Sequence, residues 1–506
     1  MSAPTSPSPD NRGPGLRRSL SVWQAVGLSV ALMAPSMAAN INPQGTALQV
    51  GRAVPLAFFL AAVGVLLVAY GFVRLCQYYQ HAGSVYAFVG ATLGPRTGFV
   101  SGFGLMGTYA FYGVVTGMAS GIFGTAFLQD IGVWHSAPTW APFLLAGIAI
   151  LLALFLTVVP AKRGTSVLLI VEAVTVSLIL VITAVVLVRI LSGSAPNDAS
   201  FDLSVFVPEP GSDVSAIFLG IVFGFLSFAG FEAAATLGEE ARNPRRDIPR
   251  AILGTAIFGG IYFVVVTAVE MMAFGTDADG VAAFGESESL LGDIGTSYLG
   301  SWVGDAVTLG AAISAFGCCL ACIVGASRLL FALARDASGD KGLGRTSAAG
   351  TPANAAVAVA ALMAVIIVVT IFFGAEPFDT FLWSATIGTL LLLVIYVLTT
   401  IGAIRLVFVQ KKMSVPAWQI VIPIAALVVL GYTIYRNVIP YPTEGAARWF
   451  PIVAGVWLLL AILVVVAAPG LARRIGANLT SAEGFAQDEH GGADTSPHRP
   501  GAGVRG

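Results

Sequence analysis

Residues 221–250 read IVFGFLSFAGFEAAATLGEEARNPRRDIPR, and this stretch decides how the rest of the chain is interpreted. Its apolar pattern predicts a helix that runs to about Ser227, followed by Gly230 and the carboxylate of Glu232. A charge at the centre of a membrane span costs about 2.5–3.5 kcal/mol, and a glycine inside a helix costs roughly 1 kcal/mol relative to alanine. The two together indicate a helix broken around a binding site, because interrupted membrane helices expose backbone groups to a ligand. A kinked packing helix whose Glu232 bonds a neighbour explains these residues equally well.

The composition is that of an integral membrane protein. Of the 506 residues, 57% are apolar and only 10% are charged, whereas soluble domains average about 25% charged residues. The net charge of −1 and the lack of a basic block give no indication of nucleic-acid binding. The four cysteines lie in apolar segments, so we expect neither a disulfide framework nor a metal site, and no cofactor. They are Cys76, Cys318, Cys319 and Cys322.

The hydropathy pattern predicts an all-α protein with twelve membrane spans of about 20 residues or more. The expected spans lie near residues 21–47, 53–76, 96–126, 140–159, 164–191, 213–237, 249–274, 300–334, 353–373, 378–408, 416–436 and 449–469. They form one transmembrane domain over residues 20–470. The tails, residues 1–19 and 471–506, are polar and are expected to be disordered and cytosolic.

Lysine and arginine residues set the expected orientation. They concentrate in the N-terminal tail and in the loops after spans 2, 4, 6, 8 and 10, while the opposite loops are acidic. Cytoplasmic loops of membrane proteins carry the excess of positive charge. We therefore expect a multi-pass plasma-membrane protein with both termini in the cytoplasm.

The first expected span is interrupted as well as the sixth. Pro35 lacks a backbone donor and breaks the helical ladder, and Asn40 adds a polar group just beyond it. The two interruptions lie five spans apart, which indicates two five-helix units inserted with opposite topology. The units are expected over residues 20–192 and 213–410, with two extra helices over residues 416–470.

Four motifs carry a resemblance to a known family. Gly230–Phe231–Glu232, then Glu239–Glu240 and the sequence NPRRDIPRA from Asn243, resemble the sixth-helix signature of the amino acid–polyamine–organocation permeases. A Gly-x-x-Tyr element ending at Tyr86, the end of span 8 over residues 325–336, and Thr351–Pro352 are similar to further elements of that family. The resemblance covers about residues 20–410. It implies the leucine-transporter fold and alternating access around spans 1 and 6.

The interrupted spans supply the candidate substrate site. If span 1 unwinds at Pro35–Ala38, the N–H groups that begin its outer half would hold a substrate carboxylate, and carbonyls of span 6 would face the ammonium group. This is the kind of site that the resemblance implies. The expected substrate-binding residues are Ala34, Pro35, Ser36, Met37, Ala38, Tyr112, Phe228, Ala229, Gly230 and Phe231. Glu232 and Glu172 are expected to act in coupling or gating.

Two departures from the family pattern bear on the substrate. Pro35–Ser36–Met37–Ala38 stands where many members have a Gly-Ser-Gly-like turn, which leaves open a ligand other than an ordinary α-amino acid. Glu172 lies on the helix where proton-coupled relatives use a lysine. It could be a proton site, but pairing with a cytosolic arginine is the favoured interpretation.

The predicted function is secondary active transport of an amino acid, by proton-coupled uptake. Sodium coupling is disfavoured because Ser314 and Ser327 are the only hydroxyls of span 8 beyond its entry. Alternatives are an amino acid exchanger or a polyamine or amine permease, although only Glu232 is evident as an acid at the site. A receptor that binds without transport stays open, as does the oligomeric state. A membrane enzyme is disfavoured because the four histidines lie in loops or in the tail, and a major facilitator fold does not suit the paired interruptions.

Overall fold

The computed structural model describes residues 21–79, 85–159, 164–196, 199–209, 213–237, 241–338, 341–347 and 351–468, with residues 470 and 474. Every element within these residues is helical, so the prediction of an all-α protein is confirmed. The predicted N-terminal tail lies outside the described residues, as do residues 471–506 other than 474, His81, Gly83 and the Glu239–Glu240 pair.

The helices follow the expected order along the chain. In the first half they are α1 (Val22–Met33), α2 (Pro35–Val50), α3 (Val54–Tyr78), α4 (Val85–Leu93), α5 (Pro95–Asp130), α6 (Ala141–Val158) and α7 (Gly164–Leu191). The second half has α8 (Ile217–Phe228), the 3-10 helix η5 (Phe231–Leu237), α9 (Pro244–Phe274), α10 (Ala278–Glu286), α11 (Leu290–Tyr298), α12 (Ser301–Ser338), α13 (Ala353–Phe372) and α14 (Pro377–Ile404). The last two long helices are α15 (Val421–Val438) and α16 (Trp449–Ala467).

Ten helical stretches in the described part of the chain are long and apolar enough to cross a membrane. One of them, Val22–Tyr78, includes α1, α2 and α3 together, and the apolar stretch Val214–Phe228 is shorter than the other candidates. These stretches make the chain a multi-pass membrane protein. The number of twelve spans stays a prediction.

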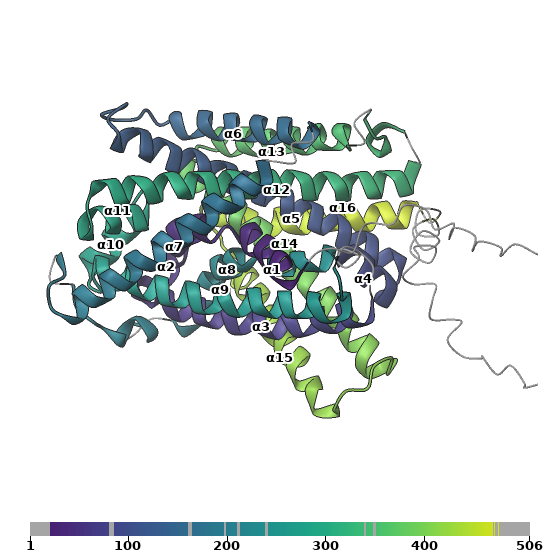
Figure 1. Cartoon of the computed structure of the whole chain (residues 1–506). Coiled ribbons are helices and arrows are strands. Elements are labelled where there is room, and N and C mark those ends of the chain that lie inside the picture. Colours follow the sequence, from purple (N-terminus) through teal and green to yellow (C-terminus); the bar gives the residue numbers. More distant parts are fainter. Residues whose placement is uncertain are drawn as a thin grey trace, which may run out of the picture.

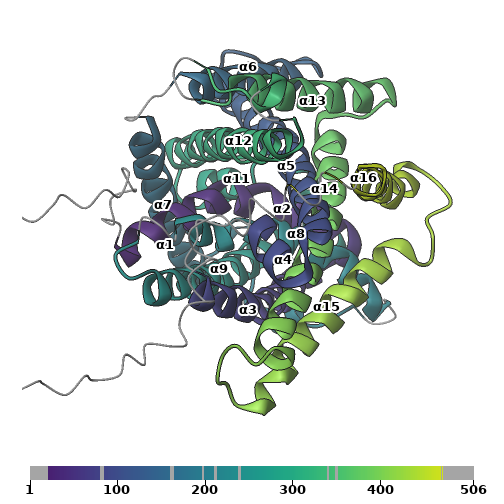
Figure 2. The ribbon, with the colours of Figure 1, turned by 90° about the vertical axis from the view of Figure 1, so that its right-hand side faces the viewer.

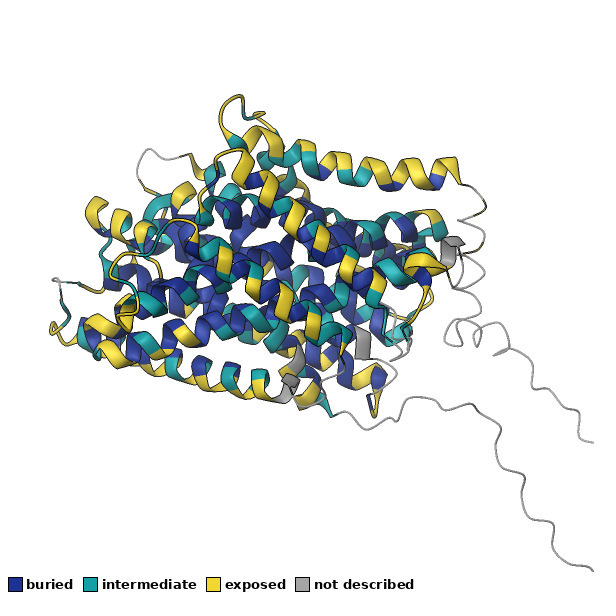
Figure 3. Ribbon diagram, turned by 90° about the horizontal axis from the view of Figure 1, so that it is seen from above, coloured by how far each residue is buried: buried dark blue, intermediate teal, exposed yellow. Residues whose placement is uncertain are grey.

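The outer helices present apolar side chains to their surroundings. Leu459, Leu463 and Val466 of α16 are exposed, as are Ile170 and Val174 of α7. Figure 2 shows α15 and α16 at the edge of the bundle, away from α6 and α13. Buried residues fill the middle, and many exposed ones lie on the outermost helices (Figure 3). A large exposed apolar surface suits contact with lipid rather than water.

Helices of the two halves pack against each other in pairs. The pairs are α2 with α8, α3 with α9, α5 with α12, and α6 with α13 (Figure 1). In each pair the second helix belongs to the span expected five positions after the first. The short helix α4 lies at one end of the bundle, and α10 and α11 lie at the other (Figure 1). Most residues of α2 and α8 are buried, so this pair lies in the interior of the bundle.

Glycine lets some of these helices approach at backbone distance. A Cβ added to Gly121 of α5 would lie 2.1 Å from the carbonyl oxygen of Pro142 and 2.9 Å from the backbone nitrogen of Ala146, both on α6. Neither atom belongs to a side chain that can rotate away. The contact between α5 and α6 therefore requires glycine, as small residues do in membrane helix packing.

Gly121→Ala should destabilise the protein by about 1–3 kcal/mol, the usual cost of overpacking. Gly147→Ala on α6 is the matched control, because a Cβ there meets nothing within 4 Å. In the control the higher helix propensity of alanine should leave stability unchanged or raise it by up to about 1 kcal/mol. Thermal unfolding of both variants in detergent measures the difference, and equal midpoints would contradict the described packing.

Candidate functional site

The connection between α1 and α2 is a single residue. Ala34 has φ 45° and ψ 56°, a left-handed conformation, and its N–H donates to the carbonyl of Ala31 over 3.2 Å. Pro35 then begins α2, where its fixed φ suits the first helical position and its missing donor costs nothing. The expectation that Pro35–Ala38 unwinds is therefore wrong: these residues form the first turn of α2, and Ala34 alone makes the break.

The connection between α8 and η5 lies directly against the end of α1. It consists of Ala229 and Gly230, and Gly230 has a φ of +108°. A Cβ on Gly230 would lie 3.0 Å from the carbonyl carbon of Leu32. Both the backbone conformation and this close approach require glycine. The two interruptions, almost 200 residues apart in the sequence, thus meet in the interior of the bundle.

Hydrogen bonds pair the helical halves on each side of this meeting point. On one side the backbone N–H of Ala234 in η5 donates to Ser29 Oγ of α1 over 3.0 Å. On the other side Asn42 Nδ2 of α2 donates to Ser227 Oγ of α8 over 2.7 Å. Two pairs of half-helices therefore meet at the interruptions, α1 with η5 and α2 with α8.

The first turn of α2 has a partner for each of its backbone N–H groups. Ser36 N donates to Glu172 Oε1 of α7 over 3.0 Å, and Met37 N donates to Ser314 Oγ of α12 over 3.4 Å. Ala38 N donates to the carbonyl of Ala34 over 2.8 Å, and Pro35 has no N–H. Groups of the protein itself therefore occupy the donors that were expected to hold a substrate carboxylate.

Glu172 is buried at this position, with 7% of its surface exposed. The favoured interpretation paired it with a cytosolic arginine, which is wrong, because its hydrogen bond goes to Ser36. Among the described residues no arginine pairs with Glu172. The carboxylate instead meets the positive end of α2, where a negative charge is most favourable.

Glu232 caps the second interruption. Its Oε2 accepts hydrogen bonds from Gly230 N and from the hydroxyl of Tyr396 in α14, each over 3.2 Å. The Tyr396 ring packs edge-on against Phe231 and Phe72, with ring centroids 5.9 Å and 5.8 Å away. Glu232 therefore stabilises the break and joins it to α14.

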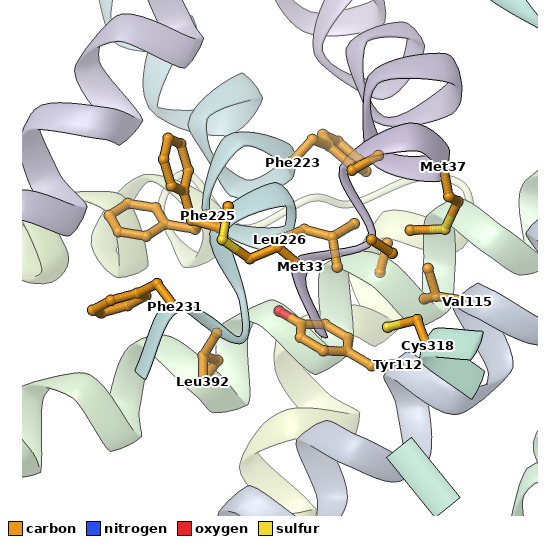
Figure 4. Close-up of a cluster of buried hydrophobic side chains, with 14 of the residues drawn as sticks. Met33, Met37, Tyr112, Val115, Phe223, Phe225, Leu226, Phe231, Cys318 and Leu392 are labelled. Atoms are coloured by element: carbon orange, nitrogen blue, oxygen red, sulfur yellow. The ribbon is translucent and has the colours of Figure 1, made fainter. Parts of the chain in front are cut away.

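The remaining candidate residues surround the two interruptions and are largely buried. Figure 4 shows Met33 and Met37 near Tyr112 and Cys318, around the α1–α2 connection. The hydroxyl of Tyr112 shares a hydrogen bond with Thr389 Oγ1 of α14 over 2.9 Å. Phe228 packs on Phe263 of α9, 5.4 Å between centroids. The thiol of Cys318 donates to the carbonyl of Leu32 over 3.4 Å, as a small buried side chain would.

Three further buried residues, Tyr262, Glu270 and Tyr396, were not predicted as site residues. Tyr262 of α9 donates to the carbonyl of Pro35 over 3.3 Å. Glu270, on the same helix, is 1% exposed, and neither of its carboxylate oxygens has a hydrogen-bond partner. Its position late in an apolar span is a usable signal, because an acid inside a membrane span marks a functional site. Tyr396 gave no signal, since it lies within an ordinary run of apolar and threonine residues.

The interior of the bundle is acidic. Glu172, Glu232 and Glu270 are all buried, whereas none of the described lysine, arginine or histidine residues is. The expectation that Glu232 is the only acid at the site is therefore wrong, because Glu172 also lies at an interruption. No group of three or more histidine, cysteine, aspartate or glutamate residues in the described part could hold a metal ion.

Comparison with known proteins gives the family of this chain. The model of the family described as amino acid permease matches residues 25–468. The chain belongs to the amino acid permease family. As a member it is a membrane transporter and not an enzyme.

Relatives of this permease are named for different substrates. It is 29% identical to the branched-chain amino acid permease BcaP of Lactococcus lactis subsp. cremoris, covering 67% of this chain and 72% of that protein. It is 24% identical to the low-affinity putrescine importer PlaP of Escherichia coli, over 63% of this chain and 68% of that protein. It is also 29% identical to human cationic amino acid transporter 4, over 63% of this chain and half of that protein.

Gly230→Ala should destabilise the permease by about 1–3 kcal/mol, because alanine is strained at a φ of +108° and its Cβ meets Leu32. Gly254→Ala is the control, since a Cβ there only reaches Val26 Cγ2 at 3.8 Å. Thermal unfolding in detergent reports the effect. A Gly230→Ala variant as stable as the control would contradict the close contact of the two interruptions.

Proposed function

We propose that this permease is a secondary active transporter that moves an amino acid or a related amine across the plasma membrane, with both termini in the cytoplasm. The observation that carries the proposal is the contact between the two helix interruptions, at Leu32 and Gly230. Helices interrupted in this way place backbone groups and helix ends at the middle of the membrane, where transporters bind their substrates.

The packing of the helices supports an inverted repeat of two five-helix units, residues 20–192 and 213–410. An inverted repeat relates each helix to one five spans later. The pairs α2–α8, α3–α9, α5–α12 and α6–α13 each combine two such helices. The short helices also fit opposite orientations of the two units. Helix α4 follows span 2, and α10 and α11 follow span 7, five spans later. These two sets lie at opposite ends of the bundle (Figure 1).

Alternating access would use the two pairs of half-helices. The pair α1 and η5 closes the site toward the cytoplasm, and the pair α2 and α8 closes it toward the outside. Ala34 and Gly230 separate the pairs, and each has an unusual positive φ. A rotation of one pair against the other therefore concentrates its backbone changes at these connections, as hinges do.

Proton coupling is proposed to act through Glu232. It is a buried acid within η5 whose carboxylate accepts hydrogen bonds from Gly230 and Tyr396, so protonation would change both bonds. One proton crossing a potential of 100 mV supplies about 2.3 kcal/mol. That is roughly fortyfold accumulation of substrate, at 1.4 kcal/mol for each factor of ten.

A second candidate, transport of an amine or polyamine, is favoured by the acidic interior. Glu172, Glu232 and Glu270 are buried in the apolar spans, and no basic residue of the described part is buried, which suits a positively charged substrate. The relatives allow either substrate class, because BcaP is named for branched-chain amino acids and PlaP for putrescine.

Purified permease screened by thermal shift against the twenty amino acids, common polyamines and γ-aminobutyrate tests the proposed function. A ligand at a hundred times its Kd adds about 2.7 kcal/mol to the folded state. We expect a stabilising ligand within these classes, and its uptake into proteoliposomes driven by an inward proton gradient. A ligand that binds but is never transported would point to a receptor instead.

Glu232→Gln should reduce proton-driven uptake by at least about tenfold, because glutamine keeps the shape of the side chain but cannot exchange a proton. Tyr396→Phe is the control: it removes one hydrogen bond to Glu232 and leaves the carboxylate in place, so uptake should keep its dependence on the proton gradient. Both variants are measured in proteoliposomes at matched protein content. Wild-type uptake by Glu232→Gln would rule out the coupling role.

A further inference from the structure

The start of α2 is the one place at the candidate site where a substrate carboxylate was expected to bind. A helix start attracts anions because its first N–H groups lack partners and carry partial positive charge. In this permease those groups are already used. Pro35 has no donor, Ser36 N–H goes to Glu172, Met37 N–H goes to Ser314, and Ala38 N–H goes to the carbonyl of Ala34.

The same arrangement occurs at the second interruption. Gly230 N–H, the donor just before η5, goes to the carboxylate of Glu232. A glutamate side chain therefore occupies the first available donor at both helix starts. One comes from α7 and the other from η5 itself.

The carboxyl ends of the helices at the interruptions carry partial negative charge, opposite to the partial positive charge of the helix starts. α1 ends at Met33 and α8 ends at Phe228, so the partly negative carboxyl ends of two helices meet in the same region. The positive helix starts are neutralised by Glu172 and Glu232. What remains is a negative field, with none of the described basic side chains buried to offset it.

We propose that Glu172 is a built-in anion that selects the substrate: it occupies the carboxylate position at α2, so the permease transports an organic amine that has no carboxylate beside its ammonium group. This inference rests on the proposed transport function at the same site. The amine binds where the ends of α1 and α8 meet. An α-amino acid would bring a second carboxylate next to Glu172, where like charges repel strongly in a site shielded from water.

Pairs of compounds that differ only in the carboxylate give the test. Ornithine and putrescine, lysine and cadaverine, and leucine and 3-methylbutylamine are each an amino acid and its decarboxylated amine. Thermal shift on purified full-length permease gives the ratio of affinities within each pair, and competition for uptake into proteoliposomes confirms it. We expect the amine to bind at least about tenfold more tightly than the amino acid in at least one pair.

Two variants of Glu172 separate its charge from its hydrogen bond. Glu172→Gln removes the charge but leaves an amide oxygen to accept from Ser36 N–H, so the amine should lose affinity while the helix start stays occupied. Glu172→Ala removes both and frees the N–H of Ser36, so the preference within the pair should shift toward the amino acid by about tenfold or more. Asp247→Asn is the matched control: it changes another buried carboxylate, which accepts from the N–H of Asn243 at the start of α9, and it should leave the ratio within about twofold of wild type.

The outcomes distinguish the inference from the function on which it rests. Amino acids that bind wild-type permease as tightly as their amines, or more tightly, in every pair would overturn the role of Glu172 and would leave the transport function intact. An unchanged ratio in Glu172→Ala would overturn it too. The wild-type ratio decides the matter even if a variant fails to fold. No binding or uptake of any member of any pair, or of any other compound in the screen, would refute the proposed transport function itself.

Discussion

Backbone polar groups in the interior of a membrane protein must find partners inside the protein, because lipid offers none. An interrupted helix violates this rule unless other groups replace the lost hydrogen bonds. In this permease the replacements come from side chains of other helices: Glu172 of α7 and Ser314 of α12 at the start of α2, and Tyr396 of α14 through Glu232 at the start of η5. The interruptions therefore depend on the surrounding bundle, and the bundle is linked through them.

This dependence explains why the half-helices form two coherent pairs. Several polar side chains of α2 have fixed partners on other helices. Asn40 Oδ1 accepts from Ser289 Oγ and from Leu291 N at the start of α11, and Thr46 Oγ1 donates to the carbonyl of Gly220 in α8. α2, α8 and α11 are thus joined by directional bonds that resist sliding. The connections at Ala34 and Gly230 have no comparable ladder, so a change of shape would concentrate there.

The sequence predicted the positions of the interruptions better than their chemistry. An end of the sixth-span helix near Ser227 is within one residue of the observed end of α8 at Phe228. In the first span α1 ends at Met33 and α2 begins at Pro35, and a proline is compatible both with a break and with a first helical turn, which the sequence does not distinguish. The length and apolar character of the segments predicted the helical bundle because membrane thickness constrains both.

The contacts of the site were beyond prediction because they join residues far apart in the chain. Ser36 and Glu172 are separated by 136 positions, and Glu232 and Tyr396 by 164. No local pattern carries such a pairing, and a glutamate one turn earlier or later on α7 would have had the same appearance in the sequence. The resemblance to a family predicted the fold. The effect of the site residues that depart from the family pattern depends on their contacts in three dimensions, which the sequence alone does not give.

Fold and substrate are set by different parts of this molecule. Relatives named for a branched-chain amino acid and for putrescine match the chain at 29% and 24% identity, so the shared fold accommodates both kinds of cargo. The helices need only that each free donor at an interruption be satisfied, and a substrate carboxylate or a protein carboxylate can do this equally well. Which of the two does it decides the net charge that the site offers to its ligand. In this chain the donor at α2 is satisfied from within, by an acid on α7, and a single side chain thereby links the stability of a broken helix to the class of molecule that the permease can carry.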